Sequence, residues 1–192
     1  MKETNETKVP TPARSRVEEE LLKARTIMIF GEIDQVMARS FSERLLVLDR
    51  EAKEEIRIFI NSQGGHVESG DTIHDMIRFV ASPVKIIGTG WVASAGALIF
   101  AAAKKENRLC LPNTRFMLHQ PLGGVRGQAS DISIEAEEIL KMRDRLNRTF
   151  AEQTGQPLER IERDTDRNFW MSAEEAKAYG LVGRIIRSIQ EV

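Results

Sequence analysis

The chain has 192 residues, 41% of them hydrophobic and 30% charged, which is the composition of a globular protein able to bury a sizeable core. Its formal net charge of −1 argues against nucleic acid or an anionic membrane as the main partner. Cys110 is the single cysteine, which excludes an intrachain disulfide and favours a reducing compartment such as the cytoplasm.

The first distinctive segment covers residues 1–16. These residues are polar, include two prolines and lack the apolar stretch of a targeting signal, so they predict a mobile N-terminal arm. No apolar run in the sequence approaches the length of a membrane span. Residues 17–192 are predicted to form one domain without an internal boundary.

After this arm the sequence alternates between strand-like and helix-like patterns. Asp34 is a suitable N-cap for a helix, and a capping box of Ser172 and Glu175 begins the last helix, which ends at Gly180. The alternation predicts an α/β fold with mostly parallel strands. The expected strands are 26–30, 55–60, 84–88, 107–111 and 114–119, and the expected helices follow Asp34 and span 67–80, 95–104 and 130–154.

The segment at 90–97 places Ser94 among glycine and alanine residues. It connects the strand-like run at 84–88 with the apolar helix-like run that begins at Ala95. A serine at such a corner has an exposed hydroxyl, and free backbone N–H groups and the positive end of the helix dipole lie beside it. This pattern is suited to a nucleophile.

Two further motifs complete a possible catalytic set. His119 ends a short apolar run and is a candidate general base. Gly64 and Gly65 form a paired-glycine turn that can donate an amide to an oxyanion. Each motif alone is more often structural, because small residues allow close packing and a lone histidine usually fills a hydrogen-bonding role. Together the motifs indicate a serine hydrolase.

Three of these segments carry a resemblance to a known family: Asn-Ser-Gln-Gly-Gly at 61–65, Ala-Ser-Ala-Gly-Ala at 93–97 and Met-Leu-His-Gln-Pro at 117–121. The chain resembles the Clp protease proteolytic subunit, peptidase family S14, over residues 20–190 without evident insertions. The resemblance implies an α/β fold of the Clp/crotonase type, a superhelix of repeated ββα units. It also implies one long protruding helix, called the handle, at 130–154.

The resemblance also implies roles for individual residues. Ser94 is the expected nucleophile and His119 the expected general base. The backbone amides of Gly65 and Ala95 are expected to form the oxyanion hole. The chemistry of this family requires neither a cofactor nor a metal ion, so none is predicted.

Asn168 occupies the third position of the triad, where the family has an aspartate. The motifs on either side align without a gap, which fixes this register. An aspartate holds the histidine in the productive tautomer and stabilises the imidazolium, and its replacement by asparagine in a serine protease costs about 10⁴-fold in kcat. The sequence therefore predicts a divergent paralogue with a Ser-His-Asn triad and weak intrinsic activity, which contact with a partner increases.

The family's assembly suggests the partners. The resemblance implies heptameric rings that stack in pairs through the handle, enclose the sites in a chamber and receive protein substrates from an ATP-driven unfoldase. A paralogous Clp proteolytic subunit is a further candidate partner. Arg57 and His74 stand where the family has aromatic residues, which brings direct docking of the unfoldase into question. The apolar positions that match the family's docking pocket are Phe59, Phe79, Leu109 and Leu111.

The predicted function is that of the proteolytic subunit of an ATP-dependent serine endopeptidase, which degrades unfolded proteins to short peptides. One alternative is a nearly silent ring that supports or gates an active paralogue; Asn168 favours it, whereas the intact Ser94 and His119 oppose it. The other alternative is a crotonase-like acyl-CoA enzyme, which shares the fold and its oxyanion hole. That chemistry needs no serine–histidine pair, so the complete motif set argues against it.

Overall fold

The computed structural model describes residues 16–123 and 126–192. The arm predicted at 1–16 lies outside the described residues except for Arg16, which begins α1 (Arg16–Lys23). Within this helix no residue is buried. The prediction of one domain over 17–192 stays a prediction.

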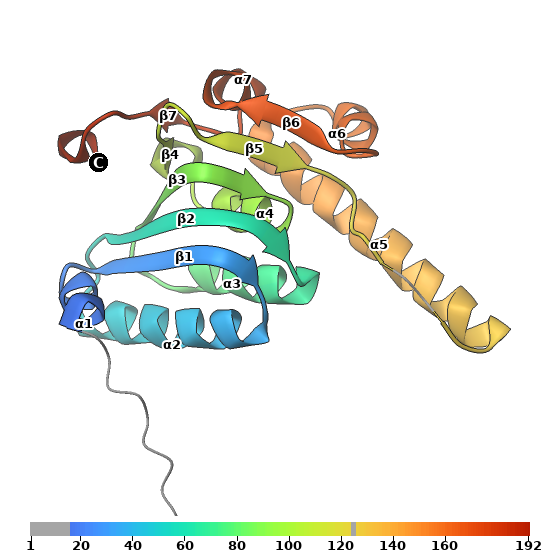
Figure 1. Ribbon diagram of the computed structural model, residues 1–192, viewed down its shortest axis with the longest axis horizontal. Helices are drawn as coiled ribbons and strands as arrows, with labels where there is room; N and C mark the ends of the chain where they lie inside the picture. Colours follow the sequence, from blue (N-terminus) through green and yellow to red (C-terminus); the bar gives the residue numbers. More distant parts are fainter. Residues whose placement is uncertain (1–15, 124–125) are drawn as a thin grey trace, which may run out of the picture.

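Within the described residues, seven strands form one sheet at the centre of the molecule (Figure 1). They are β1 (Thr26–Ile33), β2 (Ile56–Gly65), β3 (Val84–Ala93), β4 (Arg108–Cys110), β5 (Arg115–Leu118), β6 (Phe169–Ser172) and β7 (Arg184–Ile185). β1, β2, β3, β4 and β7 lie side by side in that order and are parallel, which confirms the predicted α/β class. β5 is parallel to the end of β3, and β6 is antiparallel to β5.

The remaining helices are α2 (Gln35–Glu51), α3 (Val67–Phe79), α4 (Ala95–Ala101), α5 (Ala129–Thr154), α6 (Leu158–Asp164) and α7 (Ala173–Tyr179), with short 3₁₀ turns η1 (Lys105–Asn107) and η2 (Ile189–Glu191). The predicted caps are confirmed: Asp34 accepts the Met37 N–H at 2.7 Å, and Ser172 and Glu175 form a capping box. Gly180 ends α7 with a φ of 93°, in the left-handed region that favours glycine. The sequence prediction missed α6, β6 and β7.

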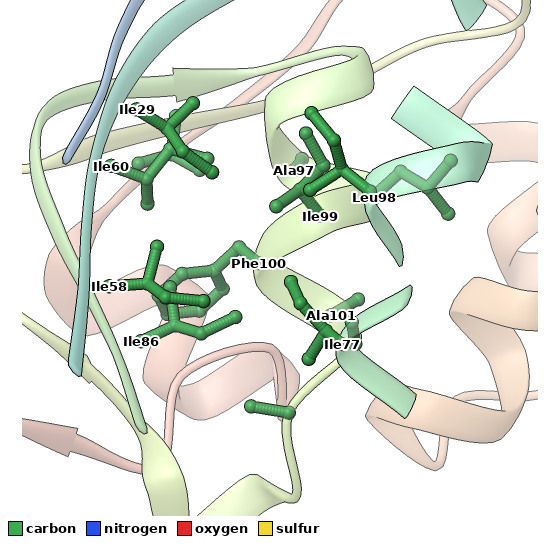
Figure 2. Packing of buried hydrophobic residues seen from close by; sticks show 14 of the residues in the cluster. Ile29, Ile58, Ile60, Ile77, Ile86, Ala97, Leu98, Ile99, Phe100 and Ala101 are labelled. Atoms are coloured by element: carbon green, nitrogen blue, oxygen red, sulfur yellow. The ribbon is translucent and has the colours of Figure 1, made fainter. Parts of the chain in front are cut away.

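Helices α2, α3 and α4 cover one face of the sheet (Figure 1). Every residue of α4 is buried, because the helix lies between the isoleucine side chains of the strands and the neighbouring helices. Figure 2 shows Phe100 of α4 directed at Ile58 and Ile86 of the sheet. A helix that is apolar on all sides is fixed in place by the core. The residue at its N-terminus is therefore held rigidly.

α5 leaves the body of the protein as a long projecting helix (Figure 1). The apolar stripe predicted for 130–154 is buried only near its C-terminal end, at Leu146 and Phe150. Ile132, Ile134 and Leu140 are exposed. The projecting part therefore presents apolar side chains to its surroundings, as the predicted handle requires.

The base of α5 is anchored by buried polar contacts. Arg108 of β4 is 1% exposed and donates from Nη2 to the Gln153 carbonyl oxygen at 2.7 Å, close to the C-terminus of the helix, where a cation is favourable. Thr165 donates from its hydroxyl to Asn147 Oδ1 at 2.9 Å. Gly183 donates its N–H to the Arg108 carbonyl, and a Cβ at this position would lie 2.0 Å from the Lys105 oxygen. This close approach gives a structural reason for glycine at 183.

Candidate active site

Ser94 lies at the corner between β3 and α4, as predicted. Its φ of 57° is in the left-handed region, which is costly for a residue with a side chain. Its N–H donates to the Met117 carbonyl of β5 at 2.9 Å, and its side chain makes no capping bond to α4. The hydroxyl is thus held at a strained corner and directed away from the helix.

His119 follows β5 directly and faces the serine. β5 pairs with the end of β3, with Met117 opposite Ala93, so the next residues of both strands meet at the same edge of the sheet. The His119 Nε2 and Ser94 Oγ atoms lie 2.7 Å apart. This distance allows direct proton transfer from the hydroxyl to the imidazole.

Asn168, the residue that precedes β6, makes a side-chain hydrogen bond to the same histidine. The antiparallel register places Leu118 opposite Phe169, and their chain neighbours His119 and Asn168 adjoin that pair. Burial lowers the pKa of His119 below its ordinary value, while a side-chain hydrogen bond to Asn168 acts in the opposite direction. Since Ser94 engages Nε2, Nδ1 is the ring nitrogen available to Asn168. Because the pKa of His119 is lowered, its imidazole is neutral near pH 7, which is the protonation state that a general base needs.

Asp166 does not replace the missing carboxylate. Its backbone oxygen accepts from Gln120 Nε2 at 2.8 Å, and its carboxylate lies 3.5 Å from Arg143. These contacts direct Asp166 toward Gln120 and Arg143, whereas Asn168 contacts the imidazole.

The paired glycines end β2 beside the nucleophile. A Cβ on Gly64 would lie 2.6 Å from Ser94 Cβ, and one on Gly65 would lie 2.2 Å from the Ile33 carbonyl oxygen. Both glycines have positive φ. The Ser62 hydroxyl braces the turn by donating to the Gly31 oxygen at 2.6 Å and accepting the Gly64 N–H at 3.0 Å. Only glycine allows this close approach to Ser94.

Replacement of Gly64 by alanine tests this contact. The added methyl group displaces Ser94, and a shift of about 1 Å in a reacting group can cost about 10²-fold in rate. We expect the rate at which a fluorophosphonate labels Ser94 to fall by that order. Gly155→Ala is the matched control, because Gly155 also has a positive φ but its Cβ would meet nothing within 4 Å. Equal labelling of both variants would contradict this account.

A small pocket adjoins the serine and histidine. Its cavity volume is 20 Å³, about the space of one water molecule. The lining residues are Val67, Ser94, Ala95, Leu98, His119, Pro121, Leu146 and Phe150. Sequence reasoning assigned Leu146 and Phe150 to the apolar face of a long helix and gave no signal that this face borders the site.

Three of the predicted partner-binding residues, Phe59, Leu109 and Leu111, lie apart from the catalytic residues, on the sheet face that α2, α3 and α4 leave uncovered. Phe59 and Leu111 pack against a small apolar cluster that contains Leu109. Leu109 is fully buried there, so its own side chain is not accessible to a partner. Phe79 is 77% exposed at the end of α3 and is not part of this cluster.

Cys110 is not a nucleophile. Its side chain is buried, and burial raises the pKa of the thiol to about 12. This agrees with its interpretation as a small core residue. None of the helices in residues 16–123 and 126–192 combines the length and hydropathy needed to cross a membrane.

The fold and the contact between Ser94 and His119 define a serine-type hydrolase, because the geometry allows nucleophilic attack with base assistance. The family model described as Clp protease matches residues 12–189, and the chain belongs to this family. Membership makes the protein a serine-type endopeptidase and confirms the resemblance seen in the three motifs.

Relatives match nearly the whole chain. ATP-dependent Clp protease proteolytic subunit 3 from Rhizobium meliloti (strain 1021) is 59% identical over 97% of this chain and 96% of its own length. ATP-dependent Clp protease proteolytic subunit 2 from Gluconobacter oxydans (strain 621H) is 62% identical over 93% of this chain and 81% of its own. The structure of an Asn-to-Asp mutant of ClpP1 from Listeria monocytogenes is 55% identical, with a TM-score of 0.85, over 91% of this chain and 98% of that chain.

Proposed function

We propose that the protein is the proteolytic subunit of an ATP-dependent protease that degrades unfolded proteins to short peptides inside a chamber of two stacked heptameric rings. The observation that carries the proposal is the 2.7 Å contact between Ser94 Oγ and His119 Nε2 in a member of the Clp protease family. The names of the relatives, which are called ATP-dependent proteolytic subunits, support the dependence on ATP. The reducing cytoplasm is the proposed location.

The proposed mechanism begins with attack of Ser94 Oγ on the carbonyl carbon of a peptide bond. His119 takes the hydroxyl proton on Nε2 and then gives it to the leaving amine, which leaves an acyl-enzyme. Water attacks the acyl-enzyme with the same base and releases the carboxylate product. The amides of Gly65 and Ala95 stabilise the oxyanion, since the glycine turn and the start of α4 both adjoin Ser94.

Asn168 lowers the activity of this site in the proposal. It can orient His119 through its carbonyl oxygen, but it supplies no negative charge to stabilise the imidazolium. The lowered pKa of His119 is consistent with this, because burial is not offset by a carboxylate.

The proposed assembly uses the projecting part of α5. Two rings stack through these helices, whose exposed apolar residues are Ile132, Ile134 and Leu140. The ATP-driven unfoldase docks at the apolar residues of the opposite sheet face, Phe59 and Leu111, together with Phe79 of α3. Docking is a separate part of the proposal from the chemistry at Ser94.

A second candidate function is a nearly silent ring that supports or gates a more active paralogue. The neutral Asn168 favours it. Curated relatives numbered as second or third proteolytic subunits indicate that such proteins occur alongside others of the family in those organisms. Addition of an active paralogue distinguishes the two functions. If this chain forms a silent ring, all activity of the mixture comes from the active sites of the paralogue. If this chain is a protease itself, Ser94 contributes activity as well.

Assembly and substrate selection are tested together. Native mass spectrometry of the full chain, alone and with a paralogue, is expected to show stacked heptamers, and Ile134→Glu is expected to reduce them to single rings. Glu138→Gln on the same helix is the control.

Short peptides should be cleaved without ATP, whereas folded proteins should not. Monomers alone under both conditions, or rapid cleavage of folded proteins without an ATPase, would overturn the proposal.

A further inference from the structure

An ion pair joins α3 to α5 across 74 positions of the chain. Arg145 donates from Nη1 to Asp71 Oδ1 at 2.7 Å and from Nη2 to Asp71 Oδ2 at 2.6 Å. The Asp71 side chain is 19% exposed and that of Arg145 is 51% exposed. Two parallel bonds from a planar guanidinium fix both the distance and the orientation between the helices, unlike the single contact of most surface ion pairs.

The two helices joined by this pair both contribute to the wall of the pocket beside Ser94. Val67 is the first residue of α3, and Leu146 of α5 follows Arg145 directly in the chain. Both side chains line the pocket. A change in the spacing between α3 and α5 therefore changes the width of the pocket.

The charges around the pair favour Asp71 as the partner of Arg145. Glu68 and Asp75 of α3 also face the arginine and, together with Asp71, raise the pKa of its guanidinium, with the hydrogen bond to Asp71 as the largest cause. Each of these two carboxylates has a histidine within reach: His66 lies 3.2 Å from Glu68 and His74 lies 2.9 Å from Asp75. Asp71 is the carboxylate that binds Arg145 through both oxygens.

We propose that Asp71 and Arg145, here called the α3–α5 clamp, set the width of the pocket and restrict the residue whose carbonyl is attacked to a small aliphatic side chain. The inference rests on the proposed attack by Ser94. The cavity volume of 20 Å³ is about the space of one water molecule, so the pocket at its present width offers little room for an aromatic side chain. The clamp residues touch neither the nucleophile nor the base, so they are positioning residues.

The other polar anchors described for α5 lie away from α3. Arg108 and Thr165 hold α5 at Gln153 and Asn147, on the side of β4 and the loop that precedes Asn168. Neither contact reaches α3. Among the polar contacts described for α5, the bonds between Arg145 and Asp71 are the ones that connect it to α3.

The test compares two peptidyl phosphonates that differ only in the reacting residue, alanine in one and phenylalanine in the other. Both phosphonylate an activated serine without turnover, and intact mass spectrometry of the full chain gives the rate for each. We expect the wild-type protein to react faster with the alanine probe. Asp71→Asn should lower the ratio of the two rates by at least about five-fold, because one wall of the pocket is released.

Two further variants separate positioning from general destabilisation. Arg145→Asp combined with Asp71→Arg reverses the pair and is expected to restore the ratio. Asp144→Asn breaks the ion pair between Arg148 and Asp144 on the solvent side of the same helix and is expected to leave the ratio unchanged. Should Asp71→Asn fail to fold, Arg145→Lys keeps the charge, loses the two-bond geometry and should lower the ratio by itself.

The outcomes are distinguishable. An unchanged ratio in folded Asp71→Asn or Arg145→Lys protein, or an equal change in Asp144→Asn, overturns the clamp and leaves the proposed function intact. Failure of both probes to label Ser94 in the wild-type protein overturns the proposed function and this inference with it. A lowered ratio that the reversed pair restores supports the clamp.

Discussion

Replacement of Asn168 by aspartate is expected to raise kcat/KM for a short peptide by about ten-fold or more. The added carboxylate stabilises the imidazolium that forms when His119 takes the proton from Ser94, in a partly buried site where charges interact strongly. The serine and histidine already lie 2.7 Å apart, so the gain should appear in the protein alone. Peptidase assays on the purified variant measure it.

The same substitution is expected to shift the acidic limb of the pH profile. Burial lowers the pKa of His119 in the present protein, and a neighbouring carboxylate favours the charged imidazolium and raises that pKa. Since the base acts only when neutral, the rise of kcat/KM should occur at higher pH in the Asn168→Asp variant than in the wild type.

Asn168→Ala is the matched control, because it removes the hydrogen bond and adds no charge. We expect it to lower kcat/KM and leave the acidic limb without an upward shift. If Asn168→Asp produces neither a gain in rate nor a shift of the limb, with or without a paralogue, Asn168 is a neutral variant and the account of weak activity is wrong.

Replacement of Ser94 by alanine is expected to reduce peptidase activity by at least about 10³-fold. The hydroxyl is the only group of the site that attacks the substrate, so what remains comes from binding and oxyanion stabilisation alone. Activity that persists at the wild-type level in preparations free of contaminating protease would exclude Ser94 as the nucleophile.

Ser94→Cys provides a useful companion. A thiolate is intrinsically more nucleophilic than a serine hydroxyl and depends less on a charged third residue. Iodoacetamide should modify this variant at the introduced thiol and leave the wild-type protein unmodified, because Cys110 is buried and its pKa is raised to about 12.

The position of Ser94 between a strand and a helix could be predicted because the signals for it are local. A strand-like run, a serine among small residues and an apolar run occur consecutively around Ser94, and the structure has a strained strand-to-helix corner there. Asp34 and the Ser172 capping box were readable for the same reason, since each acts on a backbone N–H three residues away.

Features that depend on distant pairing could not be predicted from the sequence. The strand expected at 55–60 continues to Gly65, because Gly64 and Gly65 pair with Glu32 and Ile33 of β1 despite the low strand propensity of glycine. β6 was missed because its short run acquires strand structure from β5, about fifty residues earlier in the chain.

The pocket illustrates the same limit. The apolar residues of α5 keep the same helical spacing from Ile132 to Phe150. Only the C-terminal end of this stripe packs on the body of the protein and borders Ser94. Which part of the stripe is covered depends on where α5 leaves the sheet. The bond between Asp71 and Arg145 likewise has no local signature, because it joins two helices that are separate in the chain.

The most direct test of the central claim is to locate the adduct that a fluorophosphonate forms with the full chain, using peptide mapping by mass spectrometry. The account predicts one adduct, on Ser94, whose rate of formation rises with pH as His119 loses its proton and falls sharply in His119→Ala. An adduct on another residue, or labelling of Ser94 at the same rate without His119, would contradict the account.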